Sequence, residues 1–239
     1  MLSVAAAHAA SANWPPIPPV RPPVMKAAPG PEAKPAPSAP PASTPVPAPA
    51  AAPAAADACL AELKSKGVEA EAASAAPASS AGCGIASPVR LKSVGLAGGG
   101  VVDLPARPML ECAFAVAFTD FLRDLVVPLS RAQLGAPVVA LDTGPGYDCR
   151  PQDHIPGARV SPHGMGIAID VAAFVLADKR RLPVGHDANA QDAAFMQTIR
   201  RASCGWFTTI LGPGDPDHAE HFHFDIKQHG ASENYRICE

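Results

Sequence analysis

The sequence predicts an α+β fold in which a small antiparallel sheet is flanked by helices and cross-linked by disulfides. Apolar residues follow helical spacing in two segments, and short runs rich in β-branched and aromatic residues follow them along the chain. All six cysteines lie within residues 59–239 of the 239-residue chain. We therefore expect one domain over residues 59–239.

The first 58 residues have a composition that cannot build a hydrophobic core. Sixteen of the 29 prolines precede Cys59, and the aromatic content of this stretch is Trp14 alone. Such a chain favours polyproline II, which has no internal hydrogen bonds and acts as a semi-rigid spacer. We expect residues 1–58 to be a Pro/Ala-rich disordered tether.

The start of the chain is similar to the end of a secretory signal. Residues 1–12, MLSVAAAHAASA, place a short apolar stretch before small residues of A-x-A type, without a preceding basic region. We expect a truncated signal peptide and export, most simply to the periplasm. The alternative is that these residues are only the head of an Ala-rich tail.

The first predicted helix follows Pro108 and covers MLECAFAVAFTDFLRDLV, where Pro starts the helix and apolar residues recur three and four positions apart. A short apolar run over residues 137–141 comes next. Residues 142–161 contain many Gly and Pro residues and predict a loop.

The second half of the domain predicts strands around one more helix. Residues 166–175 are apolar around Asp170 and predict a buried strand. Residues 189–204 have the pattern of a second helix, and residues 207–211 and 222–226 that of two further strands.

The cysteines indicate disulfides rather than a metal or redox site, because the even set contains no C-x-x-C pair. Three disulfides allow fifteen pairings. Cys59 and Cys83 bracket a compact Ala/Gly/Ser segment, and Cys238 lies where a cross-link would prevent fraying. The pairing that we predict is Cys59–Cys83, Cys112–Cys149 and Cys204–Cys238. Six buried thiols in a cytosolic protein remain the alternative.

Charge and hydropathy exclude two classes of protein. With 19 basic and 22 acidic residues and no basic cluster, the chain lacks the electrostatic footprint of a nucleic-acid-binding protein. No run of about 18 apolar residues is present, so we expect no transmembrane span.

Two segments concentrate side chains that bind metals. The segment SPHGMGIAID places His163 and Asp170 on either side of glycines, and DHAEHFHFD packs three His and three carboxylates into residues 217–225. Imidazole and carboxylate are ligands of catalytic Zn²⁺, which usually takes three protein ligands and leaves the fourth position to water. His163, Asp170 and one residue of the second segment would supply that set.

Strand alternation narrows the choice in the second segment. If residues 220–225 are extended, His221 and His223 point to one face, and Phe222 and Phe224 point to the core. Glu220 is then the predicted general base. The alternatives are a buried His163–Asp170 pair without metal and a solvated polar strand, while His154, His186 and His229 are expected on the surface.

The motifs resemble those of a known family. Ser161-x-His163-x-x-Gly166-x-Ala168-x-Asp170 followed by Glu220-x-x-His223 resembles the S-x-H-x-x-G-x-A-x-D and E-x-x-H motifs of the LAS-type D-alanyl-D-alanine metallopeptidases. The stretch from Tyr147 through Arg150 to Ser161 is more specifically similar to the bacterial extensin-like C-terminal domain family, a relative of those peptidases. The resemblance covers about residues 58–239.

The resemblance implies a LAS-like fold and a role for each matching residue. His163, Asp170 and His223 would bind Zn²⁺, Glu220 would be the base, and His221 would assist. Arg150 would hold an oxyanion or a substrate carboxylate, as a guanidinium fork suits either task. Tyr147 and Ser161 would complete the substrate-binding side. Cys149 lies between Tyr147 and Arg150, which differs from a plain Tyr-Arg element.

Two functions follow as hypotheses. The first is a zinc peptidase that cuts peptidoglycan stem peptides, as a D,D-carboxypeptidase or an endopeptidase in cell-wall remodelling. The second is a non-catalytic wall-binding module with a structural zinc, in which His221 would be the fourth ligand and close the site. In both cases the expected partners are peptidoglycan peptides, and a monomer is favoured.

Overall fold

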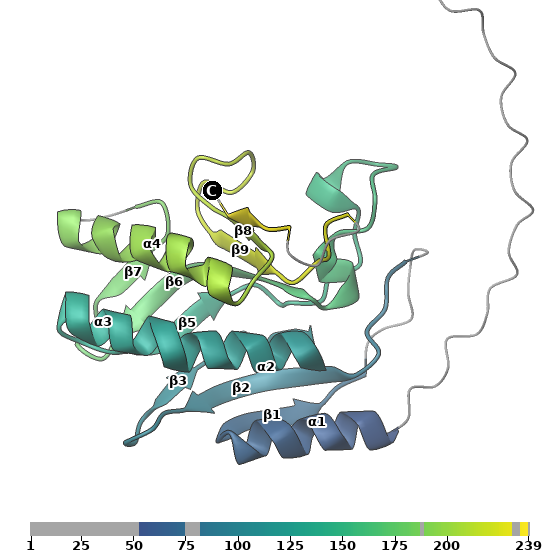
Figure 1. Ribbon diagram of the computed structural model, residues 1–239, viewed down its shortest axis with the longest axis horizontal. Coiled ribbons are helices and arrows are strands. Elements are labelled where there is room, and N and C mark those ends of the chain that lie inside the picture. Colours follow the sequence, from purple (N-terminus) through teal and green to yellow (C-terminus); the bar gives the residue numbers. More distant parts are fainter. Residues whose placement is uncertain (1–52, 75–81, 187–188, 231–234, 239) are drawn as a thin grey trace, which may run out of the picture. The chain divides into compact units, whose positions relative to one another are not determined.

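The computed structural model describes residues 53–74, 82–186, 189–230 and 235–238. Residues 1–52, where the expected signal-like start and most of the expected tether lie, are outside the described residues. The α+β class is confirmed, with four α-helices and a mixed sheet in the described part (Figure 1).

The sheet is larger than expected. It has ten strands in the order β1-β2-β3-β5-β6-β9-β8-β10, with β4 paired to β2 and β7 to β6. The pairs are antiparallel except β3 with β5 and β8 with β10. The strands are β1 (Val68–Ala72), β2 (Pro88–Gly95), β3 (Val101–Asp103), β4 (Met109–Glu111), β5 (Val138–Thr143), β6 (Ala168–Leu176), β7 (Arg181–Pro183), β8 (Thr209–Leu211), β9 (Phe222–Asp225) and β10 (Ile237–Cys238).

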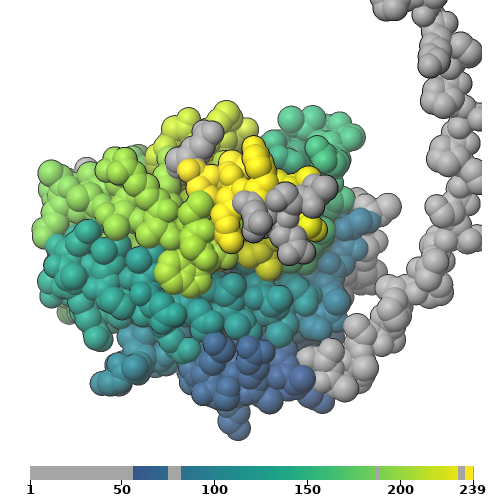
Figure 2. Space-filling model, viewed as in Figure 1, coloured from purple at the N-terminus to yellow at the C-terminus, as the bar shows by residue number. Residues whose placement is uncertain are grey.

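The helices pack on one face of this sheet and bury the core against it (Figure 1). They are α1 (Pro53–Ser65), α2 (Cys112–Phe121), α3 (Val127–Leu134) and α4 (Ala190–Ala202), with a π-helical turn η1 (Leu122–Val126) between α2 and α3. Shorter 3₁₀ turns are η2 (Gln152–His154), η3 (Pro162–Met165) and η4 (Ser203–Gly205). Figure 2 shows α2 and α3, in teal, between the blue N-terminal elements and the green α4.

The first predicted helix differs from the structure at both ends. Residues 109–111 form strand β4 instead of a first turn, because Met109 donates to the Pro145 carbonyl and the Glu111 side chain accepts from two backbone amides, which holds them extended. The helix begins at Cys112 and continues to Leu134. The π-helical turn comes just before Pro128, whose ring would clash with the carbonyl four residues back in a regular α-helix.

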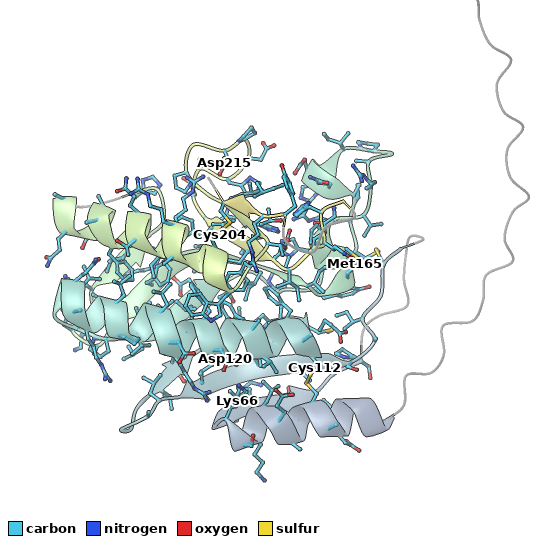
Figure 3. The ribbon with its side chains drawn as sticks, viewed as in Figure 1. Lys66, Cys112, Asp120, Met165, Cys204 and Asp215 are labelled. Carbon is cyan, nitrogen blue, oxygen red and sulfur yellow. A yellow bond between two sulfur atoms is a disulfide. The ribbon has the colours of Figure 1, made fainter. Side chains whose placement is uncertain are left out.

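The N-terminal elements add a helix and strands for which the sequence pattern predicted nothing. Helix α1 begins at Pro53, ahead of the expected domain start at Cys59. Lys66 Nζ lies 2.9 Å from the Asp120 carboxylate and joins the end of α1 to α2 (Figure 3). Strand β1 reads Val-Glu-Ala-Glu-Ala, and its small Ala side chains give a weak apolar alternation.

Aromatic side chains fill the core between the helices and the sheet. All eight phenylalanines are buried. Phe121 on α2 is central, because its ring centroid lies 5.1 Å from that of Phe207 and 5.4 Å from that of Phe224. The prediction that Phe222 and Phe224 point into the core is confirmed.

The disulfide pairing was predicted correctly for one bond of three. Cys204–Cys238 is confirmed, but the other bonds are Cys59–Cys112 and Cys83–Cys149, so the predicted Cys59–Cys83 and Cys112–Cys149 are wrong. Helix α1 packs beside the start of α2, which brings Cys59 to Cys112. Proximity in sequence was a poor guide, because strands β1 to β4 all lie between Cys59 and Cys112 in the chain.

Among the described residues, no helix combines the length and apolarity that crossing a bilayer requires.

We expect Phe121→Ala to lower the free energy of unfolding by about 3–5 kcal/mol, because the truncation leaves a cavity among four aromatic neighbours. Chemical denaturation measures the loss. Ile155→Ala is the control, since the Ile155 side chain is 57% exposed and its truncation should cost less than about 0.5 kcal/mol. Equal losses would show that Phe121 does not anchor the core.

Candidate metal centre

The floor of the candidate site is the sheet face that the helices leave open. Strand β9 pairs with β6 so that Asp170 lies opposite His223. Because Phe222 and Phe224 point to the helices, the alternating His223 and Asp225 point to the other face. Strand pairing therefore places Asp170 and His223 side by side.

His163 comes to this floor from the turn η3. Ser161 precedes the turn and its Oγ accepts a hydrogen bond from the His163 amide. Gly166 ends the turn with a φ of 69°, and its carbonyl accepts from the Glu111 amide. Met165, labelled in Figure 3, marks this turn beside the start of α2. The turn thus positions His163 next to Asp170 on strand β6.

Three side chains converge. His163 Nε2 lies 3.2 Å from His223 Nδ1 and 3.2 Å from Asp170 Oδ2, and His223 Nδ1 lies 3.0 Å from Asp170 Oδ1. One ligand atom from each residue lies within 4.8 Å of the others. The structure therefore brings together the three residues that the sequence suggests as metal ligands.

Each of the two imidazoles has an inner nitrogen that faces the cluster and an outer nitrogen that points away from it. The hydrogen bond of the outer nitrogen orients the ring. His163 Nδ1 lies 2.8 Å from the Gly146 carbonyl oxygen, and His223 Nε2 lies 3.1 Å from Asp225 Oδ2. These oxygens can only accept, so each outer nitrogen would carry the proton once a cation occupies the centre. The inner nitrogens would then present their lone pairs to that cation beside the Asp170 carboxylate.

The three side chains direct acceptor atoms toward one another with no donor group from the described residues between them, and such an arrangement favours binding of a cation. Imidazole nitrogen and carboxylate oxygen form the usual ligand set of zinc, and acceptors behind the ligating histidines fix their tautomers. The residues present therefore fit a divalent metal, with His163 Nε2, His223 Nδ1 and the Asp170 carboxylate as its ligands.

Electrostatics in the metal-free cluster follow from the same contacts. Burial disfavours the charged form of His223, but hydrogen bonds to Asp170 and Asp225 outweigh it and raise its pKa to about 9. Burial likewise opposes ionisation of Asp170, yet hydrogen bonds from His163 and His223 hold its pKa well below the ordinary range. A proton on His223 thus takes the place that a metal would fill.

The cluster opens into a cavity of about 490 Å³. His221 lines it with its Nε2 3.8 Å from Asp170 Oδ1, and its ring centroid lies 5.0 Å from that of His218. Burial lowers the pKa of His221, and the nearby Asp170 carboxylate offsets this only in part. The other lining residues are Arg150, Gln152, Asp153, His154, Ser161, Pro162, Thr209, Leu211, Asp217, Asp225, Lys227, His229 and Ile237.

Two of the three residues expected to contact substrate line the cavity. Arg150 lines the cavity with its Nε 3.1 Å from Asp148 Oδ2, and Ser161 lines it while capping η3. Tyr147 is not among the described lining residues. Its hydroxyl is buried and has no hydrogen-bond partner in the part of the chain that the structure describes.

Glu220, the expected general base, lies apart from the cluster. Its Oε1 is 3.2 Å from His186 Nε2, its side chain is 77% exposed, and it is not among the described residues that line the cavity. Strand β9 begins at Phe222, so the alternation that orients His223 does not extend back to Glu220. The structure brings His221 to the cluster instead.

Two features of the cavity were missed. His154 is exposed, as expected, and His229 is half-buried, but both also line the cavity, and His229 Nε2 lies 2.7 Å from Thr209 Oγ1. Asp225 lies behind His223. The alternation of positions 221, 223 and 225 could have identified Asp225, whereas no sequence pattern links His229 to Thr209.

The chain belongs to the family described as extensin-like protein C-terminus, whose model matches residues 57–239. Searches of curated proteins and of solved structures gave no match. Membership and the three disulfides are compatible with an exported protein.

We expect Gly146→Ala to destabilise the protein and weaken metal binding. Gly146 has a φ of 79°, and an added Cβ would collide with the Met109 carbonyl oxygen, which would displace the carbonyl that orients His163. Gly135→Ala is the matched control, because Gly135 has a φ of 73° but open space around it.

The control should lose about 1–2 kcal/mol from backbone strain alone, and Gly146→Ala roughly 1–3 kcal/mol more. Denaturant unfolding and zinc titration of both variants make the comparison. Equal losses of stability with unchanged zinc affinity would contradict the role given to Gly146.

The metal-free protein should lose stability at alkaline pH. His223 has a folded-state pKa of about 9, above its ordinary value of 6.5, so its contribution is complete below 6.5 and is lost as pH rises through 9. The full contribution is roughly 3 kcal/mol. Urea unfolding across this range, with chelator present, measures it. A His223→Gln variant should lack the slope, and an identical slope would assign it to other groups.

Proposed function

We propose that this protein is a zinc-dependent hydrolase that cleaves peptide bonds in peptidoglycan stem peptides, as a D,D-carboxypeptidase or endopeptidase in cell-wall remodelling. The observation that carries the proposal is the convergence of His163, Asp170 and His223, which present three acceptor atoms at the floor of an open cavity. A site that supplies three protein ligands and opens to a cavity is typical of catalytic rather than structural zinc.

The three ligands would hold the metal. When bound, the metal would act as a Lewis acid that polarises a carbonyl and lowers the pKa of water toward neutral pH. His163 and His223 are oriented for this by their outer hydrogen bonds. Asp170 remains ionised at neutral pH, because its pKa is held low.

His221 is the residue best placed to move a proton. Its ring borders the cavity, and its Nε2 lies 3.8 Å from Asp170 Oδ1. In the proposed reaction, His221 accepts a proton from the attacking water and returns it to the amine that leaves. His218, next to it, extends the imidazole wall of the cavity.

Arg150 is the proposed anion-binding group. Among the residues that the structure describes, its guanidinium has one ion pair, with the exposed Asp148, and Arg150 lines the cavity. Its remaining N–H groups suit the developing charge on a carbonyl oxygen or the carboxylate of a peptide.

The substrate class rests on the resemblance of the His163, Asp170 and His223 motifs to those of the LAS-type metallopeptidases. A periplasmic location agrees with this substrate and with the disulfides. The expected Pro-rich tether would let the domain reach the wall.

The test is zinc content of the full chain together with release of D-Ala or of cleaved dimers from muropeptides. The wild type should bind one zinc and cleave. His221→Gln should keep the zinc and lose about 10²–10⁴-fold in turnover.

Glu220→Gln is the matched variant in this experiment, because Glu220 is adjacent in sequence but faces His186. It should keep turnover within a few fold. A large loss in Glu220→Gln with none in His221→Gln would return the proton transfer to Glu220. Zinc binding without any cleavage would favour the wall-binding module, and absence of zinc would reject both functions.

A further inference from the structure

We propose that Asp225 is a positioning residue for the metal, which holds His223 in the tautomer that ligates and supplies the second negative charge that a divalent ion requires. The inference rests on the proposed metal site and goes beyond it, since Asp225 itself contributes no ligand atom.

Asp225 is held rigidly behind His223. Its side chain is buried, and Oδ2 lies 3.1 Å from His223 Nε2. The other oxygen, Oδ1, accepts from the Lys227 amide at 2.9 Å and lies 3.3 Å from Thr208 Oγ1. Both oxygens are therefore engaged, and the carboxylate cannot rotate away from the imidazole without breaking these bonds.

The two hydrogen bonds at position 225 require a side chain whose terminal atoms both accept hydrogen bonds. The Lys227 amide donates to one oxygen, and His223 Nε2–H donates to the other. An Asn amide would have to turn its NH₂ toward one of these donors. If the NH₂ faced His223, the ring proton would move to Nδ1, the atom that faces Asp170 and His163, and this nitrogen would no longer have a lone pair for a metal.

The negative charges of Asp170 and Asp225 also support a role of Asp225 in metal binding. Asp170 and Asp225 are two carboxylates within bonding distance of one imidazole, at 3.0 Å and 3.1 Å from its two nitrogens. The half-buried Asp170 and the buried Asp225 together supply two carboxylate charges, which match a divalent cation. His163 differs, because its outer nitrogen meets the neutral carbonyl of Gly146. The carboxylate behind His223 makes that ring the more basic ligand.

The experiment measures the zinc dissociation constant of the full chain by competition with a chromophoric chelator. Asp225→Asn should bind zinc about 10–100-fold more weakly than the wild type. Asp142→Asn is the control for loss of one carboxylate, because Asp142 is half-exposed on β5 and pairs with Arg181. It should bind zinc within about twofold of the wild type, since exposed charges are screened by solvent.

A spectroscopic measurement separates positioning from a general loss of structure. In ¹H–¹⁵N spectra of the zinc-loaded protein, the Nε2 proton of His223 should exchange slowly with solvent in the wild type, because Asp225 accepts it, and faster in Asp225→Asn. A purely structural role would leave this exchange rate unchanged.

If Asp225→Asn does not fold, the Nε2 proton of His223 in the zinc-loaded wild type decides the question. Slow exchange of this proton supports the inference, and exchange as fast as in a solvent-exposed imidazole overturns it. Wild-type affinity and exchange rate in a folded Asp225→Asn also overturn it, with the proposed function intact. A wild type that binds no zinc would instead remove the proposed function.

Discussion

The antiparallel pairing of β6 with β9 is the constraint on which the site depends. It places Asp170 opposite His223, and a slip of one residue would point His223 into the core and Phe222 and Phe224 into the cavity. Phe224 packs against Phe121 and Phe207, and Phe222 packs against Phe224. Burying the rings of Phe222 and Phe224 contributes about 1.5–3 kcal/mol each and opposes such a slip. The apolar face of β9 therefore fixes the geometry of its polar face.

His163 depends on a different set of contacts, because no strand carries it. The Cys83–Cys149 disulfide joins the two loops beneath η3, the Gly84 amide donates to the Gly164 carbonyl, and the Asp148 amide donates to that of His163. The loops hold one another and are also tied to strand β4, since the Glu111 amide donates to the Gly166 carbonyl. This explains why the chain closes a disulfide beside the cluster. Long loops are costly to order, and a cross-link removes much of the unfolded chain's freedom.

The sequence predicted the part of the molecule in which local pattern and tertiary structure agree. Helix α4, strand β6 and strand β9 follow clear periodicities, and the His163, Asp170 and His223 cluster followed from alternation and motif. Strand β1 was missed because its Ala side chains give little periodic signal, whereas β2 does alternate, with Val89 and Leu91 buried, and could have been predicted. The pairing of Cys59 with Cys112 and the contact of Glu220 with His186 depend on how distant segments pack, which no spacing in the chain encodes.

A buried cluster of acceptors is unfavourable unless a cation joins it, and this ties metal binding to folding. In the metal-free protein, a proton on His223 provides that cation, and the raised pKa of His223 expresses how strongly the two flanking carboxylates hold it. A divalent ion would displace the proton because it contacts all three ligands at once and meets the charge of Asp170 and Asp225 in full. Since the unfolded chain offers no such arrangement, the binding free energy of the ion would add directly to the stability of the fold. Asp170 and Asp225 would thus stabilise the proton on His223 in the metal-free protein and the bound ion in the metal-bound protein.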